Sequence, residues 1–156
     1  MPTRGPILNK REKILLDVAV HFYVTLIAAT IIYVKTKNMA YSGIFIAGGI
    51  LIDMDHLVDY FLYFKSRINL NDLFSSTFLK SGKAYLFLHS WEIVILVLVY
   101  SFSIRSVEWF LLFLSLAMHL TIDNIQRKNP FAYLITYRIL HKFDAQVLFP
   151  EKKDSP

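Results

Sequence analysis

The stretch at residues 48–56 (GGILIDMDH) constrains what this chain can fold into more than any other. It places two carboxylates and an imidazole, those of Asp53, Asp55 and His56, inside an apolar run that is long enough to span a membrane. An ionised carboxylate is costly to bury in hydrocarbon and is rare there unless it is paired or bound to a cation. Either this run is not a membrane segment, or the three residues bind a cation or each other.

The composition favours lipid as the solvent for much of the protein surface. Of the 156 residues, 55% are hydrophobic, which exceeds the share typical of a soluble domain. There is no cysteine, so disulfides and thiolate metal sites are excluded, and any metal is held by His, Asp and Glu. The net charge of +5 comes without a nucleic-acid recognition motif. We therefore expect membrane lipid, and not nucleic acid, as the partner of the basic residues.

The hydrophobic pattern predicts an all-α, integral membrane four-helix bundle in one domain. Each apolar run is long enough to cross about 30 Å of hydrocarbon as a helix. The four predicted spans cover residues 14–34, 39–64, 84–104 and 107–125. For the first span a signal peptide is the alternative, although Asp17 and His21 interrupt its apolar region.

The polar segments around the spans predict the topology. Residues 1–13 form a flexible basic lead, residues 65–83 contain a short interfacial helix, and residues 126–156 contain an amphipathic helix at 131–142 and a tail. Lys and Arg concentrate in these three segments, whereas the other two connections carry few. The positive-inside rule then predicts a multi-pass inner-membrane protein with both termini in the cytoplasm.

Every predicted span carries a histidine with a carboxylate three or four residues away. The pairs are Asp17/His21, Asp53/His56, His89/Glu92 and His119/Asp123. On a helix, these spacings put both side chains on one face, which is how helix bundles build internal metal sites. With the predicted topology, the histidines also lie at a similar depth, in the cytoplasmic half of the bilayer. The pattern therefore predicts one buried site shared by the four spans.

We expect this site to coordinate a divalent metal, because a purely structural role would leave several charges uncompensated in lipid. The expected ligands are His21, Asp53, Asp55, His56, His89, His119 and Asp123. Seven ligands are too many for one tetrahedral zinc, which predicts two ions, or one ion with supporting partners. Zinc is the expected metal, with manganese or iron as alternatives.

The remaining ionisable residues have simpler expected roles. Asp17 can cap its helix as well as it can serve the site. Asp59 and Glu108 lie near the ends of their spans and are expected to be solvated, and His141 is expected on the surface.

The polar motifs resemble those of the YdjM-type inner-membrane metal-dependent hydrolases, also described as LexA-binding. The resemblance rests on the Gly-rich lead into Asp53-x-Asp55-His56, on His89-Ser90, on His119-x3-Asp123 and on the early helical His21. It covers roughly residues 15–125 and implies a metal-dependent hydrolase.

The chain departs from that family pattern at two places. Ile52 stands where the family has Pro, and residues 84–88 stand where the family has His-Arg-Gly before Thr-His-Ser. The missing arginine removes a binder for an anionic substrate group, a role that Lys80 or Lys83 could fill from the preceding loop.

Together these features predict hydrolysis of an ester or phosphoester of a lipid-like substrate near the cytoplasmic interface. Glu92 is the first candidate for the general base, and Asp55 is the second. Two other classes of function stay open: a small cation transporter that uses the same ligands, and a non-catalytic membrane protein whose metal is structural.

Overall fold

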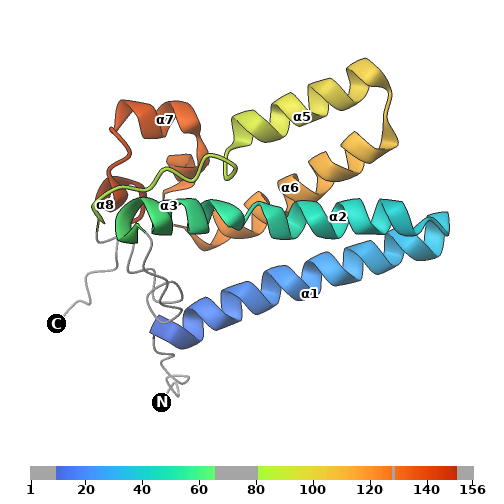
Figure 1. Cartoon of the computed structure of the whole chain (residues 1–156), viewed down its shortest axis with the longest axis horizontal. Coiled ribbons are helices and arrows are strands. Elements are labelled where there is room, and N and C mark those ends of the chain that lie inside the picture. The colour runs from blue at the N-terminus through green and yellow to red at the C-terminus, as the bar shows by residue number, and fades with distance from the viewer. Residues whose placement is uncertain (1–9, 66–80, 128, 151–156) are drawn as a thin grey trace, which may run out of the picture.

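The computed structural model describes residues 10–65, 81–127 and 129–150, which are helical and contain no β-strand (Figure 1). This confirms the predicted all-α class. The helices are α1 (Lys10–Thr36), α2 (Met39–Leu51), α3 (Met54–Phe64), α5 (Trp91–Ile104), α6 (Val107–Gln126), the 3-10 helix η2 (Pro130–Tyr133), α7 (Ile135–Leu140) and α8 (Ala145–Leu148). Most of the predicted basic lead, the predicted interfacial helix and the end of the tail fall at 1–9, 66–80 and 151–156, outside the described residues.

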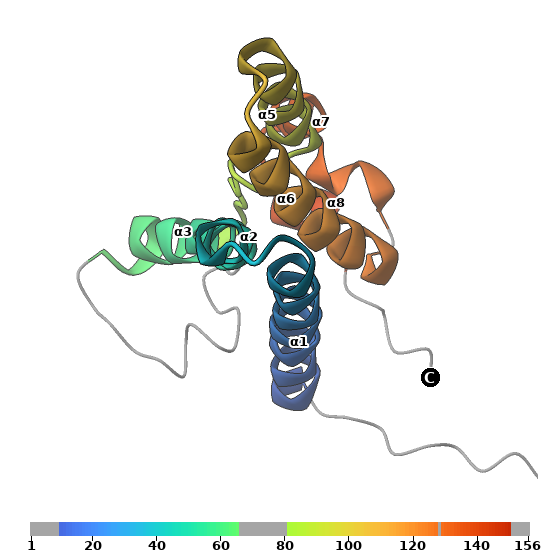
Figure 2. The same ribbon diagram turned by 90° about the vertical axis from the view of Figure 1, so that its right-hand side faces the viewer.

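The long helices pack side by side in a row. Helix α2 packs against both α1 and α6, and α6 packs against α5. Seen along the long axis in Figure 2, the four helices predicted as a bundle follow one another in an open arc, in the order α1, α2, α6 and α5. The α1–α2 and α5–α6 turns lie at one end of the row, while α3, α7 and α8 gather at the other end, where α1 begins (Figure 1).

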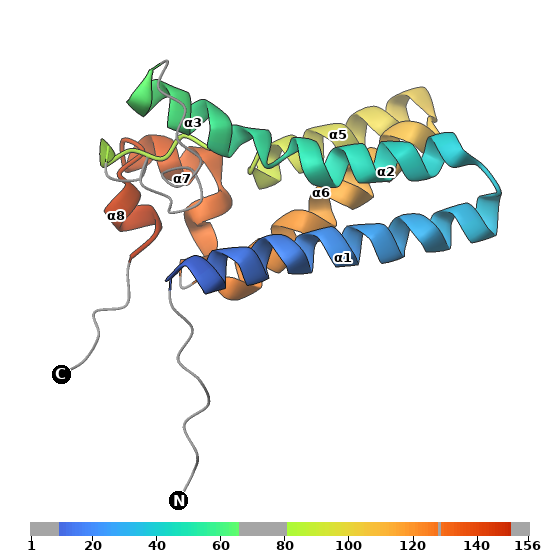
Figure 3. The same ribbon diagram turned by 60° about the horizontal axis from the view of Figure 1, so that its bottom comes forward.

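The second predicted span is broken at Ile52–Asp53, between α2 and α3. The Asp53 amide donates to the Ile50 carbonyl at 3.2 Å and the Asp55 amide to the Ile52 carbonyl at 3.3 Å, which are i to i+3 bonds of the 3-10 type. Helix α3 continues beyond this break in roughly the direction of α2 (Figure 3). Asp53 is the N-cap of α3 but makes no side-chain capping bond. The break therefore leaves its carboxylate available for other contacts.

The third predicted span begins as a helix only at Trp91, and residues 81–90 form a loop without α-helix. Carboxylates take up backbone amides of this loop: Asp59 accepts from Tyr85, and Asp55 accepts from Leu88. These carboxylates thus accept hydrogen bonds from backbone N–H groups that would bond to carbonyls in a helix. The predicted 131–142 helix is likewise divided, into η2 and α7, at Leu134.

The surface of the helices is apolar, and ionisable groups are buried among them. Of the described residues, 14–36 form the one helix that is long and apolar enough to cross a membrane, while α5 is apolar but has 14 residues. Large side chains such as Ile27, Leu96 and Phe102 are 60%, 66% and 67% exposed, whereas His89 and His119 are 0% and 1% exposed. Exposed apolar side chains in this number are unusual for a water-soluble monomer, although an apolar core around Ile52, Val94 and Leu120 is also buried.

Two glycines set the close approach of α2 to its neighbours. A Cβ at Gly49 would lie 2.8 Å from Thr25 Oγ1 of α1, and a Cβ at Gly48 would lie 2.9 Å from Leu112 Cδ1 of α6. Ser115 uses the short separation to donate from Oγ to the Phe45 carbonyl at 2.6 Å. Small residues and interhelical hydrogen bonds of this kind hold helices together in lipid, where apolar burial supplies no driving force.

We expect Gly49→Ala to destabilise the protein by about 1–3 kcal/mol, because the added methyl group overpacks the α1–α2 contact. Gly43→Ala on the same helix is the matched control, since a Cβ there meets nothing within 4 Å. It should stabilise by up to about 1 kcal/mol through helix propensity. Thermal unfolding in detergent measures both, and equal effects of the two substitutions would contradict the packing described for α2.

Candidate metal centre

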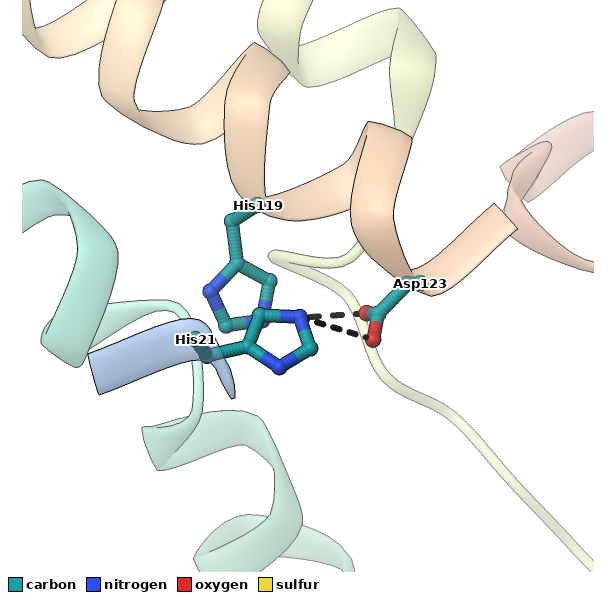
Figure 4. Close-up of side chains that lie close together, drawn as sticks. All are labelled: His21, His119 and Asp123. Atoms are coloured by element: carbon teal, nitrogen blue, oxygen red, sulfur yellow. Dashed lines mark ion pairs between the residues drawn. The ribbon is translucent and has the colours of Figure 1, made fainter. Parts of the chain in front are cut away.

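Five side chains meet where α1, the α2–α3 break, the loop before α5 and the end of α6 come together. They form two groups whose possible ligand atoms all lie within 4.8 Å of one another: His21, His119 and Asp123, and Asp53, His89 and His119. Figure 4 shows the first group, with the His21 ring from α1 and the Asp123 carboxylate from α6 turned toward each other. His119 belongs to both groups, so the two form one centre.

The separations between the ligand atoms suit a metal ion. Asp123 Oδ1 lies 3.2 Å from His21 Nε2, and Asp123 Oδ2 lies 3.7 Å from His119 Nε2 and 3.8 Å from His89 Nε2. Asp53 Oδ1 lies 3.4 Å from His119 Nε2 and 3.6 Å from His89 Nε2. Two ligands each about 2.0–2.1 Å from a tetrahedral zinc are about 3.4 Å apart. The spacing in this centre therefore matches that of a coordination shell.

The hydrogen bonds of the imidazoles direct their Nε2 atoms into the centre. His21 Nδ1 lies 2.8 Å from the Asp17 carbonyl, and His119 Nδ1 lies 3.1 Å from the Gly49 carbonyl. A carbonyl oxygen only accepts, so in both rings Nδ1 carries a hydrogen, and in the neutral ring Nε2 then carries the lone pair. Metal-binding histidines have this arrangement, in which the second ring nitrogen donates to a protein acceptor.

His89 follows the same pattern with a carboxylate in place of a carbonyl. Its Nδ1 lies 3.4 Å from Asp55 Oδ2, and its ring is buried. The Nε2 atoms of His89 and His21 are buried and have no hydrogen-bond partner among the described residues, although carboxylate oxygens lie nearby. A lone pair that faces a carboxylate is repelled unless a proton or a cation lies between them. These residues therefore fit a divalent cation.

The centre is closed on one side and accessible on the other. His21, His119 and Asp123 have side chains exposed by no more than 8%, whereas the Asp53 side chain is 47% exposed. The centre is therefore accessible from the surface on the side of Asp53.

Two of the seven predicted ligands lie beside the centre and outside both groups. Asp55 Oδ2 accepts from the backbone amides of Leu88 and His89, so this carboxylate holds the loop and orients the His89 ring from behind. The His56 ring lies 4.9 Å from the His89 ring, between centroids. Asp55 and His56 are thus neighbours of His89, and the structure brings the other five predicted ligands together.

Glu92, the first candidate for the general base, lies at the N-terminus of α7. Its carboxylate accepts from Ser90 Oγ at 2.6 Å, from the Ile135 amide at 2.9 Å, and from the amide and hydroxyl of Thr136 at 3.0 and 2.9 Å. These donors occupy both oxygens, and the negative charge suits a helix N-terminus. Through these contacts Glu92 joins the start of α5 to the start of α7.

The other ionisable residues divide between surface and interior. Asp59 was expected to be solvated, but it is 5% exposed and accepts from the Tyr85 amide at 2.9 Å. Glu108 accepts from Ser106 Oγ at the start of α6, and His141 lies against Tyr137, outside both groups. The Asp17 carbonyl accepts from His21 Nδ1, and Asp17 Oδ1 lies 3.6 Å from the same nitrogen.

Arg138 is a residue that the sequence pattern did not single out. It is fully buried, and its guanidinium donates to the carbonyls of Tyr85, Leu86 and His89. Burial lowers the pKa of this guanidinium, but an arginine stays charged at neutral pH. Only one feature of the sequence indicates that Arg138 is buried. It follows Ile135 by three residues, which places it on the apolar side of the predicted 131–142 helix.

Arg138 lies close to the loop at residues 84–88, where this chain lacks the arginine of the family pattern that it resembles. Lys83 donates from Nζ to the Lys142 carbonyl at 2.6 Å, and Lys80 lies outside the described residues. An arginine does reach the loop before His89, but it comes from α7 and binds backbone carbonyls.

Comparisons of this chain with protein-family models, curated proteins and solved structures find no match. The functional interpretation therefore depends on the geometry of the centre.

We expect Arg138→Lys to destabilise the protein by at least about 2 kcal/mol, because an ammonium group lacks the planar fork and leaves buried carbonyls unpaired. The amides of Leu88 and His89 should then exchange hydrogen faster. Arg105→Lys at the exposed α5–α6 turn is the control and should change stability by less than about 0.5 kcal/mol. Unchanged exchange at residues 88–89 in Arg138→Lys would show that the guanidinium does not hold this loop.

Proposed function

We propose that this protein is a multi-pass membrane protein that uses a divalent metal to hydrolyse an ester or phosphoester of a lipid-like substrate. One observation carries the proposal: the Nε2 atoms of three imidazoles converge with two carboxylates in a buried centre. Nitrogen and carboxylate ligands with a free coordination position are the set that hydrolytic zinc centres use.

The distribution of polarity supports a membrane location for the whole helical row. The outward faces of α1, α2, α5 and α6 carry exposed apolar side chains, and the buried ionisable groups face one another. Irregular backbone at membrane depth must be satisfied inside the protein. Asp55, Asp59 and Arg138 do this for backbone groups of Tyr85, Leu86, Leu88 and His89. We place the end of the row where α1 begins in the cytoplasm, because the basic segments at 1–13 and 65–83 join it there.

Within the centre, we propose that His21, His119 and Asp123 hold the ion, because all three are buried. Two imidazoles and one carboxylate leave a fourth position for water or substrate, as in catalytic zinc sites. Asp123 presents Oδ1 to His21 and Oδ2 to His89 and His119, so it can also bridge to a second ion held by Asp53 and His89. Zinc fits this ligand set best, with manganese and iron as the alternatives.

Asp53 is the carboxylate that we propose as the general base. It lies in the centre and is the most exposed of the five residues, whereas Asp55 and Glu92 are engaged by backbone donors. A bound divalent ion would polarise the carbonyl or phosphoryl oxygen and acidify water. Asp53 takes a proton from water, the water oxygen bonds to the carbonyl carbon or the phosphorus, the ester bond to the alcohol oxygen breaks, and that oxygen receives the proton.

We expect stoichiometric metal in protein purified without chelator, and its loss in His119→Ala, because His119 serves both ligand groups. His141→Ala is the matched control and should keep its metal, since His141 lies outside both groups. Elemental analysis measures the metal-to-protein ratio and counts the ions. An absence of metal in the folded wild-type protein would remove the basis of the proposal.

We expect Asp53→Asn to retain the ion held by His21, His119 and Asp123, and to lower the rate of hydrolysis of a phospholipid mixture by about 10²–10⁴-fold, the usual contribution of a general base. Metal-loaded wild-type protein without any turnover would indicate a structural metal instead. Cation uptake into sealed vesicles that is lost in Asp53→Asn would indicate transport.

A further inference from the structure

A cavity of about 260 Å³ lies between α1 and α2 and reaches the metal centre. The two helices are antiparallel, so Asp53 and His21 lie toward one end of the cavity, and Leu26 and Ile46 lie at the other. The stretch of α1 that lines it, from Val18 to Leu26, corresponds to a length of about 12 Å at helical rise. One end of this cavity is therefore polar and lies at the proposed metal.

The wall of the cavity is apolar beyond that end. Apart from His21, Thr25 and Asp53, the residues that line it are glycine or hydrocarbon side chains such as Phe22 and Ile50. Its volume lies below the range of about 300–1,000 Å³ that is typical of pockets for drug-sized ligands. An apolar space of this size with polar groups at one end suits one unbranched aliphatic chain better than a ring system or a branched polar molecule.

The position of the cavity also indicates how a chain would enter. Phe22, Leu26 and Ile50 line it and are 54%, 43% and 52% exposed on the outer face of the row. In a bilayer that face meets lipid, and a chain that slides in sideways would run along α1 and α2, as lipid chains do. Its polar end would then lie beside Asp53, the exposed member of the centre.

We infer that the α1–α2 cavity binds one acyl chain of a membrane lipid, and that the ester or phosphoester at the head of that lipid lies at His21 and Asp53. This inference rests on the proposed hydrolase function and specifies its substrate class as an acyl lipid. A short, water-soluble ester would reach the same centre but would leave the apolar part of the cavity without a partner.

The test fills the cavity with a tryptophan side chain and measures lipid binding by photolabelling, independently of hydrolysis. The probe is a phosphatidylethanolamine with a photoreactive diazirine near the end of one acyl chain, added to the full-length protein in detergent micelles. Saturable labelling of α1 and α2 peptides is expected in the wild-type protein. Ile46→Trp should lower this labelling at least about tenfold, because the indole takes up space in the cavity. Loss of the burial of two methylene groups of the acyl chain already weakens binding by about that factor. Leu26→Trp fills the cavity from the opposite wall and is the second variant.

The matched control is Ile27→Trp, which adds the same indole to α1 at a residue that is 60% exposed and does not line the cavity. Its labelling should equal that of the wild-type protein. If labelling of α1 and α2 is not saturable, or if Ile46→Trp and Ile27→Trp give the same labelling, the cavity does not bind the chain.

Kinetics with butyryl and palmitoyl esters of one head group separate this inference from the hydrolase proposal. We expect Ile46→Trp to raise KM for the palmitoyl ester about tenfold with little change in kcat, and to leave the butyryl ester unaffected. Wild-type turnover that does not depend on chain length would overturn the inference and leave the hydrolase standing. Saturable labelling that Ile46→Trp abolishes, with no turnover of any ester, would support chain binding and overturn the hydrolase.

Discussion

The convergence of three imidazoles with two carboxylates is the constraint on which the rest of the structure depends. The Nε2 atoms of His21, His89 and His119 lie 3.2–3.8 Å from oxygens of Asp53 and Asp123. Without a cation or protons between them, such an arrangement repels itself in a medium that screens charge poorly. A divalent ion bound between them would replace this repulsion with an attraction that holds α1, α2 and α6 together at one point.

The surrounding residues serve to hold these five side chains in place. Gly48 and Gly49 let α2 approach α1 and α6, so that the Gly49 carbonyl reaches His119 Nδ1 at 3.1 Å. Around the loop before α5, Asp55 accepts amide hydrogens and Arg138 binds carbonyls, which positions His89 without a helix. The centre is thus built by backbone groups as much as by side chains, and it opens through Asp53 to an apolar cavity between α1 and α2.

The sequence predicted the helical class from its hydrophobic pattern, and five of the seven expected ligands meet in the centre. Local spacing accounts for the pair His119 and Asp123, whereas His21, Asp53 and His89 were expected there from their common depth in the predicted spans. Pairs such as His119 and Asp123 lie on adjacent helical turns, and periodicity is enough to put them on one face. The break at Asp53 and the loop before Trp91 were not predicted, because they depend on contacts between residues far apart in sequence. Asp59 accepts a hydrogen bond from the Tyr85 amide, and Glu92 accepts one from the Ile135 amide at the start of α7. For the same reason Arg138, 49 residues from His89 in sequence, could not be assigned to this site from its neighbours alone.

The most direct test of the account is the anomalous scattering of crystals of the protein purified without chelator, measured above the absorption edge of zinc. We expect a peak bounded by the Nε2 atoms of His21 and His119 and by the Asp123 carboxylate. A second peak between Asp53 and His89 would identify a two-ion centre. Well-ordered density for these side chains with no anomalous peak among them, and hydrogen-bonded imidazoles in its place, would contradict the central claim.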